Sequence, residues 1–103
     1  MANFPVQLNN TVSSDISGSI ASGGTAQNLF TSSSNQIGFS IHNLDLNNDL
    51  WINIGGTAAP FTAGSMKIPP LALYETPNNM ILVSQSVSIY GLMTGQIFTA
   101  KKY

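Results

Sequence analysis

Residues 38–60, GFSIHNLDLNNDLWINIGGTAAP, contain the two clearest strand patterns in the chain. In 36–43 and in 50–54 every second residue is large and apolar, and the residues between them are smaller or polar, apart from one tryptophan. Such alternation predicts half-buried β-strands, because successive side chains of a strand point to opposite faces. The intervening LDLNND is rich in turn-forming Asp and Asn, so we interpret the stretch as a β-hairpin with a polar turn.

The rest of the chain repeats this pattern in short runs that are bounded by Gly, Pro, Asn and Ser. Residues 57–70 are looser, and their prolines confine any strand there to the edge of a sheet. About eight strands at this spacing predict an all-β fold, a two-layer antiparallel β-sandwich of jelly-roll-like type. Residues 1–12 alternate only weakly and are expected to form an N-terminal arm, with 13–103 as a single sandwich domain. The six further predicted strands are 15–21, 25–30, 71–75, 80–84, 87–92 and 95–101.

The composition excludes several classes of partner. Only 7% of the 103 residues are charged, and the formal net charge is −1. Nucleic-acid binding requires clustered cations, but the chain has three lysines and no arginine. No apolar run approaches the roughly 18 residues that span a membrane, and there is no cysteine. Ser, Thr, Asn and Gln make up 37 residues, and such a neutral, amide-rich surface suits a protein that packs against other proteins.

The turn in the quoted stretch imitates the start of a calcium-binding loop. Asp45, Asn47 and Asp49 alternate as oxygen ligands do in such loops. The sixth and twelfth loop positions should be Gly and Glu, but they are Leu50 and Gly56. We therefore predict no metal site, and we interpret these side chains as turn residues that bond their own backbone.

A hydrolase is the enzymatic alternative. His42, the only histidine, would serve as a general base, oriented by Asp45 or Asp49, with one of the thirteen serines as the nucleophile. The sequence has no GxSxG motif to single out a serine. A lone histidine at a strand end is more typical of a surface or an interface, so we predict that the protein is not an enzyme and has no cofactor.

Contact residues are the remaining candidates for function. If Leu50 and Ile52 face the core, Trp51 points outward with Asn53 and would anchor a subunit contact or stack on a sugar. The alternative is that Trp51 lies in the second layer of the sandwich, or that the two faces are inverted. The predicted interaction residues lie in the arm, in the turn and at the tryptophan: Phe4, Val6, Leu8, His42, Asp45, Asn47, Asp49 and Trp51.

Two segments carry a resemblance to a known family. SGSIASGGTAQNLF and the later GFSIHNLDLNNDLWINIGGTAA resemble small β-sandwich virion proteins of tailed bacteriophages, and LALYE and GQIFTAKKY fit the same layout. The resemblance covers about residues 14–101, and Gln36 stands where these proteins commonly have arginine.

The resemblance implies a capsid decoration or cement protein without a cofactor. Such a protein would be located on the outer capsid surface of the virion and bind the major capsid protein. It would do so as a homo-oligomer, with a trimer favoured. The alternative is a receptor- or glycan-binding module of a tail, fibre or connector.

Overall fold

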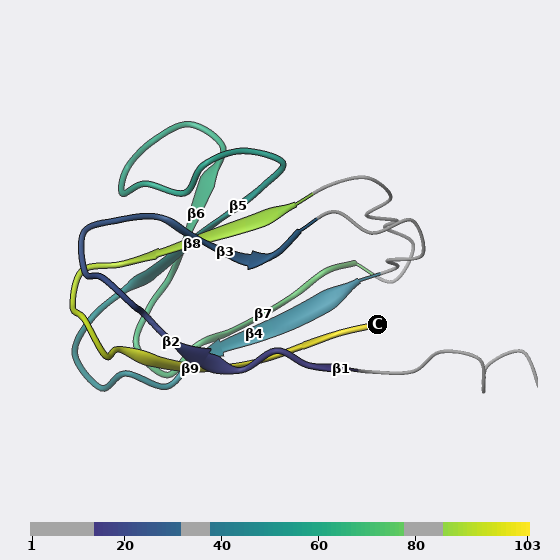
Figure 1. Cartoon of the computed structure of the whole chain (residues 1–103), viewed down its shortest axis with the longest axis horizontal. Helices are drawn as coiled ribbons and strands as arrows, with labels where there is room; N and C mark the ends of the chain where they lie inside the picture. Colours follow the sequence, from purple (N-terminus) through teal and green to yellow (C-terminus); the bar gives the residue numbers. More distant parts are fainter. Residues whose placement is uncertain (1–13, 32–37, 78–85) are drawn as a thin grey trace, which may run out of the picture.

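A computed structural model describes residues 14–31, 38–77 and 86–103. These residues form nine strands in two antiparallel sheets, and they contain no helix. Figure 1 shows the two sheets as stacked layers, which confirms the predicted two-layer β-sandwich. The strands are β1 (Ser14–Asp15), β2 (Gly18–Ser19), β3 (Gln27–Phe30), β4 (Phe39–Asn43), β5 (Leu50–Ile54), β6 (Ser65–Ile68), β7 (Leu73–Glu75), β8 (Val87–Gly91) and β9 (Ile97–Lys102).

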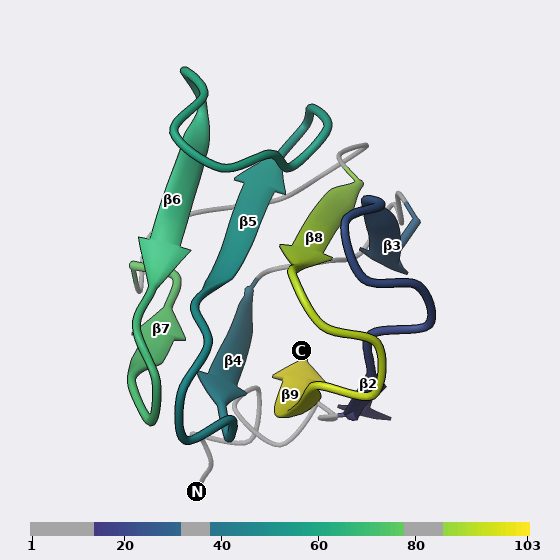
Figure 2. The ribbon, with the colours of Figure 1, turned by 90° about the vertical axis from the view of Figure 1, so that its left-hand side faces the viewer.

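The strand order identifies the sandwich as a jelly roll. One sheet has the order β1-β9-β4-β7, with β2 also paired to β9, and the other has the order β3-β8-β5-β6 (Figure 2). The pairs are nested: β5 pairs with β6, β4 with β7, β3 with β8, and β1 and β2 with β9. A long hairpin that is rolled up on itself has this nesting, and it is the topology of jelly-roll domains.

The hydrophobic core lies between the sheets and is built by the alternation seen in the sequence. Phe39 and Ile41 of β4 and Leu50 and Ile52 of β5 have no exposed surface. The ring of Phe39 also packs edge-on against Phe30 of β3, with 5.6 Å between ring centroids. Each buried side chain of this size contributes about 1.5–3 kcal/mol to folding, so these positions account for why the chain closes into two layers.

The predicted hairpin at 38–54 is wrong. β4 and β5 lie in different sheets, and residues 44–49 cross from one layer to the other. Both edges of β4 are occupied by β7 and β9, and both edges of β5 by β6 and β8. The apolar faces of β4 and β5 therefore meet across the core rather than side by side in one sheet.

Other predicted strands agree with the structure in part. The loose segment 57–70 contains β6, which is an edge strand as its prolines require. The predicted strand 15–21 is divided into β1 and β2, which both pair with β9. The predicted strand 80–84 and the arm 1–12, with Phe4, Val6 and Leu8, lie outside the described residues.

Candidate binding pocket on the outer face of the four-stranded sheet

Two aromatic residues lie side by side on the outer face of the β3-β8-β5-β6 sheet. Trp51 of β5 and Tyr90 of β8 are partners in the antiparallel register. Their neighbours along the strands, Leu50 and Ile52 of β5 and Ile89 of β8, belong to the core. The alternation of the strands thus places both aromatic residues on the face opposite to the core.

The connection from β5 to β6 folds back over this face. The N–H of Ala58 donates a 2.9 Å hydrogen bond to Oγ of Ser88, which lies on the outer side of β8, and Ala58 is fully buried. Gly56 packs against the side chain of Asn53, where an added Cβ would lie 2.9 Å from Oδ1. A larger residue at position 56 would therefore displace the side chain of Asn53 or the connection itself.

Phe61 of this connection covers Trp51. The two ring centroids are 4.8 Å apart at an angle of 64°. Trp51 lies on the outer face, as the alternation predicts, but it is only 8% exposed because this connection covers it, and its role as an interaction residue stays a prediction. The alternation shows which face Trp51 is on, but it carries no information about the connection that covers this face.

Phe61 itself is the most exposed of the large apolar residues that the structure describes, at 87%. Its φ angle of 53° lies in the left-handed region, a conformation that costs a non-glycine residue about 1–3 kcal/mol. Backbone strain of this kind clusters at ligand-binding and active sites, which makes Phe61 a candidate binding residue.

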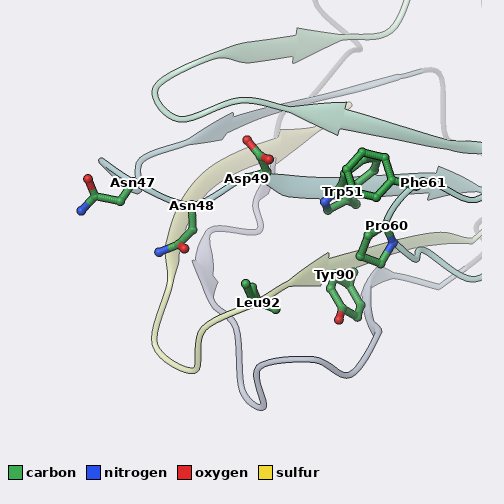
Figure 3. A pocket seen from close by; sticks show the side chains of 8 residues that line it. All are labelled: Asn47, Asn48, Asp49, Trp51, Pro60, Phe61, Tyr90 and Leu92. Carbon is green, nitrogen blue, oxygen red and sulfur yellow. The ribbon is translucent and has the colours of Figure 1, made fainter.

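A pocket of about 290 Å³ lies beside these rings. Figure 3 shows Trp51, Pro60 and Phe61 at one end and the amides of Asn47 and Asn48 at the other. The lining is mostly aromatic and apolar, with one polar end. Its residues are Asn47, Asn48, Asp49, Trp51, Pro60, Phe61, Tyr90 and Leu92.

Buried amides fix the backbone at the polar end. Asn43 Nδ2 donates a 2.9 Å hydrogen bond to the carbonyl of Asn48, and Gln96 Nε2 donates one of 2.9 Å to the carbonyl of Asp49. Both amide side chains are buried. Residues 48 and 49 are thus held by groups that are themselves fixed in the sandwich.

Asp45 closes the turn before the pocket. Its Oδ2 accepts hydrogen bonds from the N–H groups of Asn47, at 2.9 Å, and of Asn48, at 2.6 Å. These donors stabilise the charged form and lower the pKa of Asp45, the bond from Asn47 having the larger effect. This bonding confirms the interpretation for Asp45, whereas among the described residues the side chains of Asn47 and Asp49 make no such bond.

The residues proposed for hydrolysis are not assembled. Nε2 of His42 lies 3.0 Å from the carbonyl oxygen of Leu71. His42 belongs to β4 of the five-stranded sheet, whereas the pocket lies on the four-stranded sheet. Within the part of the chain that the structure describes, no hydrogen bond or ion pair joins His42 to Asp45 or Asp49. In the same residues no group of three or more His, Asp or Glu side chains gathers that could hold a metal ion.

The predicted interaction residues include Asn47, Asp49 and Trp51, which the structure brings together at the pocket. They do not include the other lining residues, which are Asn48, Pro60, Phe61, Tyr90 and Leu92. The dipeptide Pro60-Phe61 directly follows GGTAA. The presence of a bulky aromatic residue in a glycine-rich connection was the only feature of the sequence that could have pointed to Phe61 as a site residue. Tyr90 carried no signal, because its partner across the sheet was unknown.

Comparisons with known proteins add no further constraint: no protein-family model matches the chain, and no curated protein and no solved structure gives a significant match. Over the described ranges, the structure has no helix that is long and apolar enough to cross a membrane.

Proposed function

We propose that the chain is a non-enzymatic structural protein of a tailed-bacteriophage virion. It decorates the outer capsid surface, binds the major capsid protein and stabilises the shell. Two features support the proposal: the resemblance of residues 14–101 to small virion proteins, and the jelly-roll fold, which viral capsid proteins commonly use.

The observation that carries the proposal is an apolar strip on the outer face of the five-stranded sheet. Leu71, Leu73 and Ile97 are more than half exposed, at 55%, 59% and 51%. Leu73 is paired with His42 of β4, and the N–H of Leu44, just beyond β4, donates a 3.2 Å hydrogen bond to the carbonyl of Ile97. Leu73 of β7 and Ile97 of β9 thus lie on either side of β4, and Leu71 lies in the turn just before β7; we call Leu71, Leu73 and Ile97 the outer apolar strip.

Such a strip is suited to a contact with another protein. Burial of apolar surface contributes about 25 cal/mol per Å², and stable interfaces bury on the order of 1,200–2,000 Å². With only 7% charged residues, the chain has little charge to desolvate on association. A homo-oligomer, with a trimer favoured, would present several strips at once and raise the effective affinity through multivalency.

Co-sedimentation with undecorated capsids of the same phage tests the proposal. The double variant Leu73→Lys and Ile97→Lys puts two charges into the outer apolar strip, and we expect it to lose binding. Phe61→Lys, a matched charge on the opposite sheet, should bind like the wild type. Absence of wild-type binding, or equal binding by the double variant, would contradict the proposal.

A second candidate is a receptor- or glycan-binding module of a tail or fibre. One observation favours it, the aromatic pocket with amides at one end. Immunogold labelling of intact virions separates the two candidates. A tail or fibre module would be labelled on the tail and not on the capsid, whereas a decoration protein would be labelled on the capsid.

A further inference from the structure

We infer that the pocket beside Trp51, Phe61 and Tyr90 binds one neutral pyranose ring of a glycan. This inference does not depend on whether the chain sits on the capsid or on the tail. It follows from three properties of the pocket: an exposed aromatic surface, a polar end with available hydrogen-bonding groups, and a size and charge that suit a single sugar ring.

The accessible aromatic surface is that of Phe61 and of the half-buried Tyr90. Trp51, the cross-strand partner of Tyr90, is only 8% exposed and supports Phe61 from beneath, with 4.8 Å between the ring centroids. Aromatic faces carry negative partial charge, and the C–H groups on one face of a pyranose carry positive partial charge. Phe61 is 87% exposed, so its ring is accessible to such a ligand.

The polar end offers donors and acceptors for hydroxyl groups. Among the described residues, the side chains of Asn47 and Asp49 have no hydrogen-bond partner. Nδ2 of Asn48 donates to Asp45 at 3.0 Å, which leaves the Asn48 amide oxygen as an acceptor. Because Gln96 fixes the carbonyl of Asp49, this end of the pocket is ordered before a ligand arrives, and preorganisation favours binding.

Size and charge narrow the ligand class. A volume of about 290 Å³ lies just below the roughly 300–1,000 Å³ typical of ligand pockets, so the pocket suits a small ligand such as one sugar ring. Among the described residues, no lysine lines the pocket and the one charged residue that does is Asp49, which disfavours phosphorylated and other anionic ligands.

A purely apolar occupant, such as a proline-rich peptide, fits the pocket less well. It would bury the amides and the carboxylate without partners, which is unfavourable. A sugar satisfies both ends of the pocket, since its ring face is apolar and its rim carries hydroxyl groups.

Saturation-transfer NMR and tryptophan fluorescence on the full chain test the inference. The probes are the methyl pyranosides of glucose, galactose, mannose and N-acetylglucosamine, titrated into the millimolar range. We expect at least one of them to bind saturably, with magnetisation transfer to the C–H groups of one ring face.

Two glycine variants provide a matched comparison. Phe61 and Leu71 are the two non-glycine residues with positive φ among the described residues, at 53° and 65°, and both are exposed. Glycine accepts either conformation without strain, so both variants should fold. Phe61→Gly should weaken sugar binding roughly tenfold, as expected for one lost aromatic contact, and Leu71→Gly should leave it unchanged.

A third variant, Asp49→Ala, tests the polar end and should also weaken binding. The inference is overturned if none of the four pyranosides binds saturably, if Phe61→Gly binds as tightly as Leu71→Gly, or if a proline-rich peptide occupies the pocket while no sugar does.

Discussion

Asn43 is expected to be the most sensitive polar residue of the crossing between the two sheets. It is the last residue of β4 and is completely buried. Its Nδ2 donates to the carbonyls of Asn48 and Ile68, both at 2.9 Å, and its Oδ1 accepts from the N–H of Asp45 at 3.0 Å. Because Ile68 ends β6 in the other sheet, this one amide ties both layers to the turn before the pocket.

The change Asn43→Ala removes all three hydrogen bonds at once. The bond to Ile68 is buried, and the loss of a partner for a buried carbonyl costs about 1–3 kcal/mol. The bonds to Asn48 and Asp45 are partly buried, so each contributes less, about 0.5–1.5 kcal/mol. The variant should therefore lose roughly 3 kcal/mol of unfolding free energy, a large part of the 5–15 kcal/mol typical of a domain.

Urea unfolding followed by tryptophan fluorescence measures this loss directly. In a domain of about 100 residues, 3 kcal/mol lowers the melting temperature by roughly 12–24 °C. Asn47→Ala is the matched control, because the side chain of Asn47 is exposed and such changes stay within about 0.5 kcal/mol. A loss below about 1 kcal/mol for Asn43→Ala, or equal effects of the two variants, would refute the reasoning that buried hydrogen bonds hold this crossing.

Two further outcomes are expected. Trp51→Ala should lose about 3–5 kcal/mol, as truncated buried aromatic residues do, and an unchanged melting temperature in calorimetry would show that the β5–β6 connection does not cover the ring. Asp45→Asn should destabilise the fold at neutral pH and not in acid. Hydrogen bonds lower the folded-state pKa of Asp45, so its charge stabilises the fold above the unfolded pKa. This stabilisation is lost as the pH falls through the folded pKa. Urea unfolding at several pH values measures the difference between wild type and variant, and a difference that is independent of pH would contradict this account.

The inward faces of the strands could be predicted from the sequence because they depend on local alternation. Phe39 and Ile41, and likewise Leu50 and Ile52, were predicted to share a face within their strands, and all four are fully buried in the core. The approximate positions of seven of the eight predicted strands follow from the same short-range pattern and from the turn residues between the runs, whereas the predicted strand 80–84 lies outside the described residues. These features depend on only a few neighbouring residues, so one sequence is sufficient to find them.

The pairing of the strands could not be predicted in this way. Alternation indicates which side of a strand faces the core, but it is the same whether the next strand lies beside it or across the core. The hairpin at 38–54 was predicted because β4 and β5 are adjacent in sequence. The neighbours of β4 are in fact β7 and β9, and Ile41 pairs with Ala100, far along the chain.

Only the part of the pocket that is formed by neighbours in the sequence could be predicted. Asn47, Asp49 and Trp51 lie in or beside the turn that the sequence marks as polar and distinctive. Phe61 reaches them only because the β5–β6 connection folds back, and this depends on the hydrogen bond from Ala58 to Ser88, thirty residues away. No periodic pattern in residues 55–64 indicates that fold-back.

The two outer faces of the sandwich differ in how far a connection covers them, and the nesting of the strands explains this difference. The connection after β5 joins the innermost pair of the rolled hairpin, so it lies within one sheet and can fold back over that sheet alone. It covers Trp51 and forms the pocket there, whereas Leu73 and Ile97 on the other sheet stay exposed. Substitutions at sites that share no partner act independently. Capsid binding should therefore respond to Leu73 and Ile97 and not to Phe61, and sugar binding should respond to Phe61 and Asp49 and not to Leu73 or Ile97, so each role can fail without affecting the other.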